Sequence, residues 1–374
     1  MFEPGYASQR TRLRWAAVAV VVVATACAAF AASGSFIGPL NTITTLGSTV
    51  PVNGDVNPYG VAQVPVSTGN LVQGHILISN FNNSANQQGT GTTIMDVDPS
   101  AMTVTQFALI DAGSLPGPCP GGIGLTTALV VLRTGWVVVG SLPTTDGTSA
   151  TAKAGCLLVL NNMGQVVETF SGASINGPWD MTALDAGSLV ELFFTNVLNG
   201  TVAANGKVVH RATVVRFLLS VSSDQMPTLL LSTVIGSGFP ARTDPGALVI
   251  GPTGLALDAF GQTLYLNDSL SNRIAAIRNP ALRLSTAGRG RTVSQGGFLN
   301  DPLGLTLAPN GDVIAANGND GNLVEVTPRG KQVAKKLVDN TGSPPGAGTL
   351  FGLTAQPGGV FFVDDGNNTF NVLH

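Results

Sequence analysis

The stretch "LNDPLGLTLAPNGDVIAANGNDGNLVEVTPRG", residues 299–330, contains three short apolar runs separated by two polar turns. The first run, Leu303 to Leu307, is followed by a Pro-Asn-Gly turn at 309–311, and the second by an Asn/Asp/Gly cluster. Asn-Gly pairs supply the positive φ angles of tight hairpins, and short runs of apolar and β-branched residues are typical of strands. The stretch therefore predicts three antiparallel strands joined by two turns.

Five other segments of the chain repeat this pattern. Each has an apolar strand that begins near a Gly, a turn, a second apolar strand that usually ends in Asn or Asp, a polar turn and a third strand. The six copies are residues 57–99, 120–169, 176–219, 250–277, 299–330 and 348–373. Three linked strands cannot bury both of their faces alone, so the copies must stack. Radial repetition of such units predicts an all-β, six-bladed β-propeller.

The composition agrees with this fold class. Only 10% of the 374 residues are charged, whereas there are 47 Gly and 22 Pro. Without residues 1–31 the chain has 15 basic and 20 acidic residues, a net charge of −5, which gives no basic footprint for nucleic acid or anionic lipid. One local basic cluster, Arg283, Arg289 and Arg291, is expected on a solvated outer strand and loop.

Residues 1–31 have the composition of an export signal. Three Arg between positions 10 and 14 precede an apolar run over 15–32, and Ala-Phe-Ala at 29–31 supplies the small residues that signal peptidase requires. We expect a cleaved signal peptide. An uncleaved membrane anchor and a lipoprotein lipidated at Cys27 are the alternatives. The protein is therefore expected to be exported, whether periplasmic, secreted or at the cell surface.

The segment after the signal has strand composition but no blade of its own. Copy six ends at His374 after three strands, and "LNTITTLGSTV", residues 40–50, has the β-branched spacing of a pleated strand. We expect it to add the outermost strand of the last blade and so to close the ring. A disordered tail is the alternative. This gives an N-terminal segment over 32–51 and a propeller over 52–374.

Two of the copies resemble the repeat of a known family. "GPTGLALD…TLYLNDSLSNRIAAI" in copy four and "DPLGLTLAPNGDVIAANGNDGNLVEVTP" in copy five are similar to the NHL-repeat pattern "PxGhAhD…hhVaDsxNxRIxvh". The resemblance covers residues 57 to 374 and is strongest in copies four to six. Copy three departs from it, with Trp179 and Asp180 where the others have a Gly. The resemblance implies a six-bladed propeller of NHL type with four-stranded blades.

The ends of the second strands are the candidate binding residues. In a propeller these ends share one face with the starts of the strands that line the channel. They are Asn80, Gly140, Asn196, Asn267, Asn317 and Asp364, with Asp180 at the start of an inner strand on the same side. We expect this Asn/Asp-rich face to bind a ligand at the channel mouth. The structural alternative is that Asn and Asp recur there because the turn backbone requires them.

A ring of amide and carboxylate oxygens suits Ca²⁺ or Mg²⁺ rather than zinc. Six-bladed lactonases, which are similar in shape to NHL propellers, hold a divalent metal near the axis. The resemblance therefore implies Asp180, Asn267, Asn317 and Asp364 as metal ligands to test. The lactonase pattern also includes a Glu near the channel, and none of the three Glu residues after residue 31 ends a second strand.

Cys119 and Cys156 are the two cysteines beyond the signal segment, and an even pair in an exported protein suggests a disulfide. Cys119 precedes the inner strand of copy two and Cys156 starts its third strand. First and third strands lie about 9–10 Å apart, so the bond requires the flanking loops to lean together. Two buried free thiols are the alternative.

The sequence shows no convincing catalytic set. Its three His lie in different copies and have no acidic partner in a motif. We therefore expect an exported binding module for a small molecule or a protein, without a certain cofactor. The alternative is a lactonase-like hydrolase or lyase that depends on Ca²⁺ or Mg²⁺. Nucleic acid is not an expected partner, a membrane is one only if the N-terminal segment is retained or lipidated, and a monomer is expected.

Overall fold

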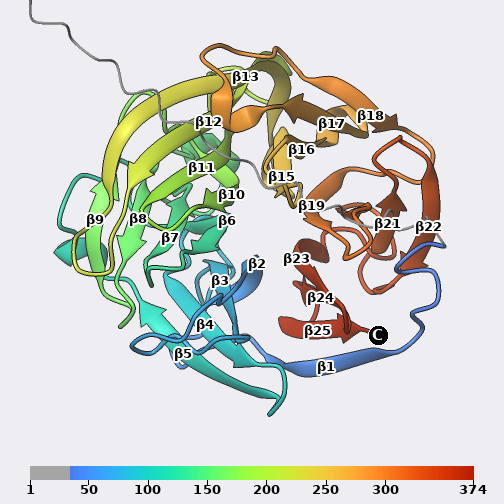
Figure 1. Ribbon diagram of the computed structural model, residues 1–374, viewed down its shortest axis with the longest axis horizontal. Helices are drawn as coiled ribbons and strands as arrows, with labels where there is room; N and C mark the ends of the chain where they lie inside the picture. Colours follow the sequence, from blue (N-terminus) through green and yellow to red (C-terminus); the bar gives the residue numbers. More distant parts are fainter. Residues whose placement is uncertain (1–33) are drawn as a thin grey trace, which may run out of the picture. The chain divides into compact units, whose positions relative to one another are not determined.

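The sheets of the protein form a ring. The computed structural model describes residues 34–374, so the predicted signal segment 1–31, with Cys27, lies outside the described residues. Six antiparallel sheets follow one another around a central axis (Figure 1). This is the predicted all-β, six-bladed β-propeller. We call the face on which the innermost strands begin the start face, and the opposite face the end face.

The strand bounds follow the six copies. Blade 1 contains β2 (Val56–Gln63), β3 (Ile76–Asn82), β4 (Thr93–Asp98) and β5 (Thr103–Leu109); blade 2 contains β6 (Leu125–Val131), β7 (Val137–Ser141), β8 (Leu157–Leu160) and β9 (Val166–Phe170). Blade 3 contains β10 (Pro178–Asp185), β11 (Leu189–Asn196), β12 (Val209–Ser220), β13 (Thr228–Asp244) and β14 (Leu248–Ile250). Blade 4 contains β15 (Pro252–Leu257), β16 (Thr263–Asp268), β17 (Arg273–Arg278) and β18 (Arg291–Gln295); blade 5 contains β19 (Pro302–Leu307), β20 (Val313–Asn317), β21 (Asn322–Val326) and β22 (Gln332–Leu337). Blade 6 contains β23 (Leu350–Gln356), β24 (Gly359–Asp364), β25 (Thr369–Leu373) and β1 (Ile43–Ser48). Four short 3₁₀ helices lie in loops of the described residues: η1 (Ala112–Ser114), η2 (Ser149–Thr151), η3 (Ser269–Ser271) and η4 (Pro280–Leu282).

The last blade takes its outermost strand from the other end of the chain. β1 pairs antiparallel with β25, from Ile43 opposite Leu373 to Ser48 opposite Thr369. The residues before β1 are also fixed, because the buried carboxylate of Glu325 accepts hydrogen bonds from the backbone N–H groups of Phe36 (2.6 Å) and Ile37 (2.8 Å). The ring is therefore closed by strand pairing between its two ends.

The core lies between the blades. Successive residues of a strand point to opposite faces of its sheet, so each middle strand contributes to two interfaces. In β11, Phe193 packs in the cluster toward blade 4 and Phe194 in the cluster toward blade 2. Each blade thus buries its apolar faces only against its neighbours, which explains why the repeats must form a ring.

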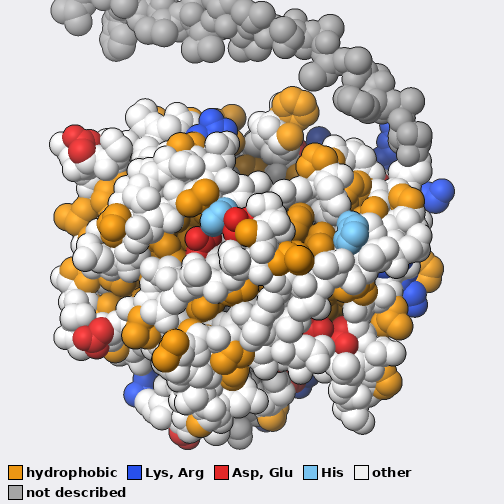
Figure 2. Space-filling view, turned by 90° about the horizontal axis from the view of Figure 1, so that it is seen from below, with side chains coloured by type: hydrophobic (Ala, Val, Ile, Leu, Met, Phe, Trp, Pro, Cys, Tyr) orange, Lys and Arg blue, Asp and Glu red, His pale blue; other side chains and the backbone are white. Residues whose placement is uncertain are grey.

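The outer surface carries few charges. Seen edge-on from the side of β1 and β5, it shows hydrophobic side chains dispersed among uncharged ones and backbone, with a few scattered acidic and basic groups (Figure 2). Within residues 34–374 no helix is long and apolar enough to cross a membrane. Nothing on this side resembles a continuous basic surface.

Cys119 and Cys156 form a disulfide bond, and their Cα atoms are 5.1 Å apart. Cys119 lies in the loop before β6 rather than in the strand, and this loop runs beside the start of β8. The cysteines can therefore approach more closely than first and third strands of a blade do.

Breaking this bond is expected to destabilise the fold. Replacing both cysteines by Ala removes a link across 37 residues, and the free energy of unfolding should fall by about 2–4 kcal/mol. Denaturant unfolding of the variant and of reduced wild type should give the same midpoint. Alkylation of both thiols in native protein without reductant would rule the bond out.

Candidate functional site

The inner strands begin with related residues that close the axis. Tyr59 stacks on Phe351 and Phe81 with ring centroids 3.9 and 4.5 Å apart, and the Trp179 ring lies 6.3 Å from it. Leu248, from the β13–β14 hairpin, belongs to the same buried cluster. The start face of the channel is therefore closed by an apolar plug.

The Gly that recurs near the start of the inner strands comes directly after the plug residue of the strand, and its role is steric. A Cβ on Gly304 would collide with the carbonyl oxygen of Phe351, because neighbouring inner strands approach each other closely around the axis. In blade 3 this position is Asp180, and its Oδ2 accepts a hydrogen bond from the backbone N–H of Leu255 at 2.6 Å. Burial raises the pKa of Asp180 to about 8. The departure of copy three thus places an acidic group beside the axis.

Beneath the plug lies an axial channel, a cavity of about 370 Å³ lined by all six inner strands. Because these strands are the edges of their sheets, their unpaired backbone groups face the cavity. Asp180 lines it, and Arg133 and Asp185 line it where the strands end. The channel therefore opens toward the end face, away from the predicted ligand face.

The predicted strand-end residues lie at the start face, but they are buried. Asn80, Asn196, Asn267, Asn317 and Asp364 are each at most 5% exposed. The amide of Asn267 donates to the carbonyl oxygens of Leu303 (3.1 Å) and Gly304 (2.9 Å) in the next blade. The amide of Asn80 donates to the carbonyl oxygen of Thr49 (3.0 Å). These side chains join the blades to each other and to the closing segment.

Asn196 and Asn317 hold the loops that lead into their own inner strands. Asn196 Oδ1 accepts from the backbone N–H of Asn176 at 2.8 Å. Asn317 Oδ1 accepts from the backbone N–H of Asn300 at 3.1 Å, and its amide donates to Asp320 at 3.0 Å. The recurrence of Asn at these positions thus has a backbone explanation in each of these blades.

The four predicted metal ligands fit a cation poorly. Asp180 is bonded to Leu255, both side-chain atoms of Asn317 are in use, and Asp364 Oδ2 accepts from Asn367 at 3.0 Å. Of the oxygens in this set, Asn267 Oδ1 is buried and accepts no hydrogen bond, so it is available to a cation. One such oxygen is far fewer than the six to eight oxygen ligands that Ca²⁺ takes. In the described part of the chain no three His, Cys, Asp or Glu residues could hold a metal together. Binding of Ca²⁺ or Mg²⁺ here stays a prediction.

A second cavity, the start-face pocket, lies beside the plug and measures about 490 Å³. The β13–β14 hairpin forms one wall, from Arg242 to Ile250. Loops of blades 4 to 6 form the rest, including the residues that follow β16 and β20 and those that precede β19 and β23. The pocket is therefore on the predicted face, but its lining comes from residues next to the predicted ones.

Three charged residues meet in the start-face pocket. Arg242 Nη2 pairs with Asp244 Oδ2 at 2.9 Å, and both line the pocket with Asp301. Burial raises the pKa of Asp301 to about 6, and the nearby Asp244 carboxylate adds to the increase. Asp301 also has a φ of 52°, a left-handed conformation that Asp and Asn adopt more readily than other non-Gly residues.

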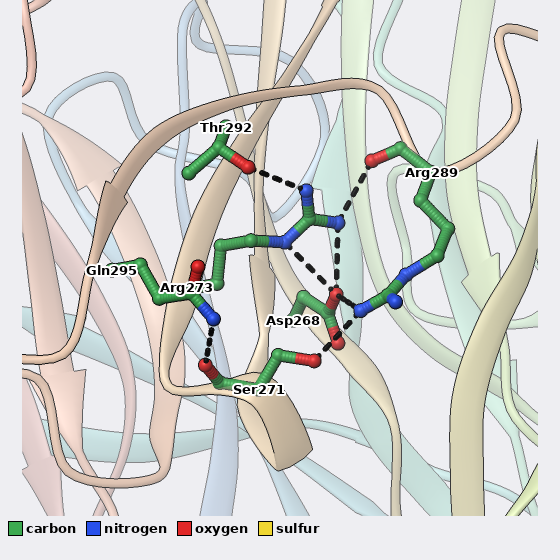
Figure 3. A network of polar contacts seen from close by, with 6 residues as sticks. All are labelled: Asp268, Ser271, Arg273, Arg289, Thr292 and Gln295. Carbon is green, nitrogen blue, oxygen red and sulfur yellow. Dashed lines mark hydrogen bonds and ion pairs between the residues drawn. The ribbon is translucent and has the colours of Figure 1, made fainter.

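A buried ionic network holds the wall of this pocket. Asp268 ends β16 and is fully buried, and its Oδ2 accepts from Arg273 Nη2 at 2.8 Å and from Arg289 Nη2 at 2.6 Å (Figure 3). Arg289 Nη2 also donates to Ser271 Oγ at 2.7 Å. Since Ser269 and its neighbours line the pocket directly after Asp268, the network fixes their position. Arg289 lies on a loop, as expected, with its side chain 39% exposed, and its guanidinium pairs with the buried Asp268.

The sequence did not predict this pocket, because the hairpin that walls it belongs to no repeat. Residues 220–249 fall between copies three and four, and β13 alone is 17 residues long. The Asp-Pro pairs at 244–245 and 301–302 carry two carboxylates of the pocket, but a third such pair at 98–99 lies in blade 1, so this motif alone does not locate the pocket.

Comparison with known proteins supports the fold. No family model matches the sequence, and no curated protein matches it. Similar solved structures include a gluconolactonase from Xanthomonas campestris (14% identity, TM-score 0.53, 88% of each chain), a calcium-binding regucalcin from Agrobacterium tumefaciens (12%, 0.50, 88% of this chain and 93% of that one) and the PQQ-bound aldose sugar dehydrogenase from Streptomyces coelicolor (15%, 0.50, 88% and 98%). At these identities the likeness shows the six-bladed propeller fold. Assignment to the NHL type stays a prediction.

Proposed function

We propose that the chain is an exported propeller that binds a small, hydroxyl-rich ligand in the start-face pocket. The observation that carries this proposal is the meeting of Arg242, Asp244 and Asp301 in one cavity of about 490 Å³. Pockets for small molecules range from about 300 to 1,000 Å³ and hold a few convergent polar groups. The Cys119–Cys156 disulfide supports export, since such bonds persist in oxidising compartments.

The chemistry of the lining selects the ligand class. The carboxylates of Asp244 and Asp301 accept hydrogen bonds, the guanidinium of Arg242 donates them, and the amides of Asn300 and Asn319 do both. Charges of both signs lie close together, so a ligand with a large net charge gains little. Adjacent hydroxyl groups, each a donor and an acceptor, match this lining. Neutral sugars, polyols and sugar lactones are therefore the compounds to test.

A thermal-shift panel of these compounds tests the proposal. A ligand present at 100 times its Kd adds about 2.7 kcal/mol of stability, which should raise the Tm by roughly 3–8 °C. Ca²⁺, Mg²⁺ and EDTA belong in the same panel. A Tm that moves with Ca²⁺ and with no organic compound would favour the metal-binding alternative and contradict the proposal.

The second candidate function is hydrolysis of a bound lactone or ester. The observation that favours it is the pKa of Asp301, about 6, beside a second carboxylate. Such a group exchanges protons readily near neutral pH and acts as a general acid or base. Turnover of lactones in the same panel, lost in Asp301→Asn while binding is kept, would distinguish catalysis from binding. This candidate needs no metal ion for the proton transfer.

A further inference from the structure

The outermost strand of blade 3 has an open edge. β13 runs along the rim of the ring (Figure 1) and pairs on its inner side with β12, from Thr228 opposite Ser220 onward. On the outer side, Ile235 accepts a hydrogen bond from Ala287 and the strand pairs with β14 only at residues 242–244. Within residues 34–374 no backbone hydrogen bond is made on the outward edge of 228–234. We call the segment 228–234 the β13 edge.

The β13 edge exposes four apolar side chains among uncharged polar ones. Leu229, Leu230, Leu231 and Val234 are 37%, 53%, 41% and 39% exposed. The pairing with β12 has β-bulges between Leu229 and Leu231 and between Val234 and Gly236, so the side chains do not alternate regularly here. Since all four apolar side chains are exposed, neither blade 2 nor blade 4 covers this part of β13. A strand edge with free N–H and C=O groups and exposed apolar side chains is a template for another strand.

The other outer strands are protected against such pairing. β9 contains Glu168, β18 contains Arg291 and β22 contains Lys335. Charged residues on an edge oppose the addition of a further strand. β1 and β5 lack charges, but each exposes only one large apolar residue, Ile43 and Leu109. β13 exposes four, and residues 225–241 contain no charged residue at all.

We propose that the β13 edge is a homodimer interface, in which the 228–234 segments of two copies pair antiparallel about a two-fold axis near Leu231. In a two-fold interface the same segment of both copies is in contact, so each residue faces the same residue or a symmetry-related one of the other copy. A strand without charged residues therefore brings no like charges together when it pairs with its own copy. A membrane is a poorer occupant, because the free backbone groups of the edge would lose their hydrogen bonds in lipid.

An acidic residue lies near one end of the edge, and a loop that carries a basic residue runs beside the other end. The exposed Asp224 lies in the turn before Thr228. At the other end the loop with Arg283 runs beside β13, since Ala287 donates to the carbonyl oxygen of Ile235 at 2.8 Å. Antiparallel pairing about residue 231 brings the turn of one copy toward the loop of the other. The partner is therefore a second copy of this chain, although a monomer is expected from the sequence.

The first test is the mass in solution. Residues 34–374, which contain all six blades and the closing strand, should sediment as a dimer at micromolar concentrations. Leu231→Lys places the lysines of the two copies next to each other at the two-fold axis, and it should weaken dimerisation at least tenfold. Leu337→Lys is the matched control, at a leucine on the outer strand of blade 5 that is 56% exposed, compared with 41% for Leu231, and it should remain dimeric. A monomeric wild type at 100 times that concentration, or a Leu231→Lys variant that dimerises normally, would overturn the proposal.

The second test is the register of the pairing. Leu231→Cys should form a disulfide with its own copy several times faster than Leu229→Cys, because residue 231 faces itself across the axis and residue 229 does not. The native cysteines do not interfere, since they are bonded to each other. Equal rates at both positions, or binding of the monomer to phosphatidylglycerol vesicles through these leucines, would contradict the dimer.

Discussion

A chain that begins at Thr49 should lose its cooperative folded state. The truncation removes β1, the partner of β25, and with it Ile37 and Leu46, which are 0% and 5% exposed. Burial of two such side chains contributes about 1.5–3 kcal/mol each. The buried Glu325 carboxylate also loses two hydrogen-bond donors, which costs about 1–3 kcal/mol or more. The total is a large part of the roughly 5–15 kcal/mol that stabilises a typical domain.

Denaturant unfolding of two truncated chains measures this effect. A chain that begins at Gly34 is the control, because it keeps every contact described above, and it should unfold in one cooperative transition. The chain that begins at Thr49 should aggregate or unfold at a much lower denaturant concentration, since the edge of β25 is exposed. Equal midpoints for the two chains would show that the ring does not depend on β1.

The protein should become less stable as the pH rises from about 4 to 8. Burial raises the pKa of Asp180 from 3.8 to about 8, and of Asp365 and Asp301 to about 7 and about 6. The folded state therefore keeps protons that the unfolded state releases above pH 3.8, so the contribution of these three carboxyl groups to stability is greatest below that pH and is lost as the pH rises through their folded-state pKa values. For Asp180 alone the change is on the order of 5 kcal/mol.

Asp180→Asn should remove most of this pH dependence. The amide keeps an oxygen that can accept the hydrogen bond from Leu255 N–H, but it does not ionise, so the variant should be more stable than wild type at pH 8 and similar at pH 4. Asp224→Asn, at an exposed turn residue, makes the same charge change and should leave the slope unaltered. A wild-type Tm that rises between pH 5 and 8 would mean that Asp180 ionises at little cost.

The propeller could be predicted from the sequence because its repeats are punctuated by turn chemistry. The Asn-Gly pair of blade 5 marks a hairpin, and the alternation of Phe193 and Phe194 between two interfaces follows from the period of a strand. The strand composition of residues 40–50 also led to the closing position at which the structure has β1. Each of these signals is local, so a single chain suffices to read it.

The pocket could not be predicted in the same way. Arg242 and Asp301 are far apart in sequence and meet through the hairpin of β13 and β14, which no repeat announces. The Asn residues that marked the face were conspicuous because several blades need them for loops, as Asn317 and Asn196 show. Repetition therefore identified structural residues, whereas the charged residues of the pocket occur once each.

Whether the ligand binds in the start-face pocket or in the axial channel can be decided by comparing the Kd values of two variants. The Kd of the tightest compound from the panel should be measured by calorimetry for wild type, Arg242→Ala and Arg133→Ala. Arg242 lines the start-face pocket and Arg133 lines the end of the axial channel, so the two changes are matched in chemistry and differ in place. Loss of a hydrogen bond to a charged group costs about 1.5–3 kcal/mol, so Arg242→Ala should raise the Kd at least about tenfold, with Arg133→Ala within about twofold of wild type. The reverse pattern would place the ligand in the axial channel and contradict the assignment of the start-face pocket.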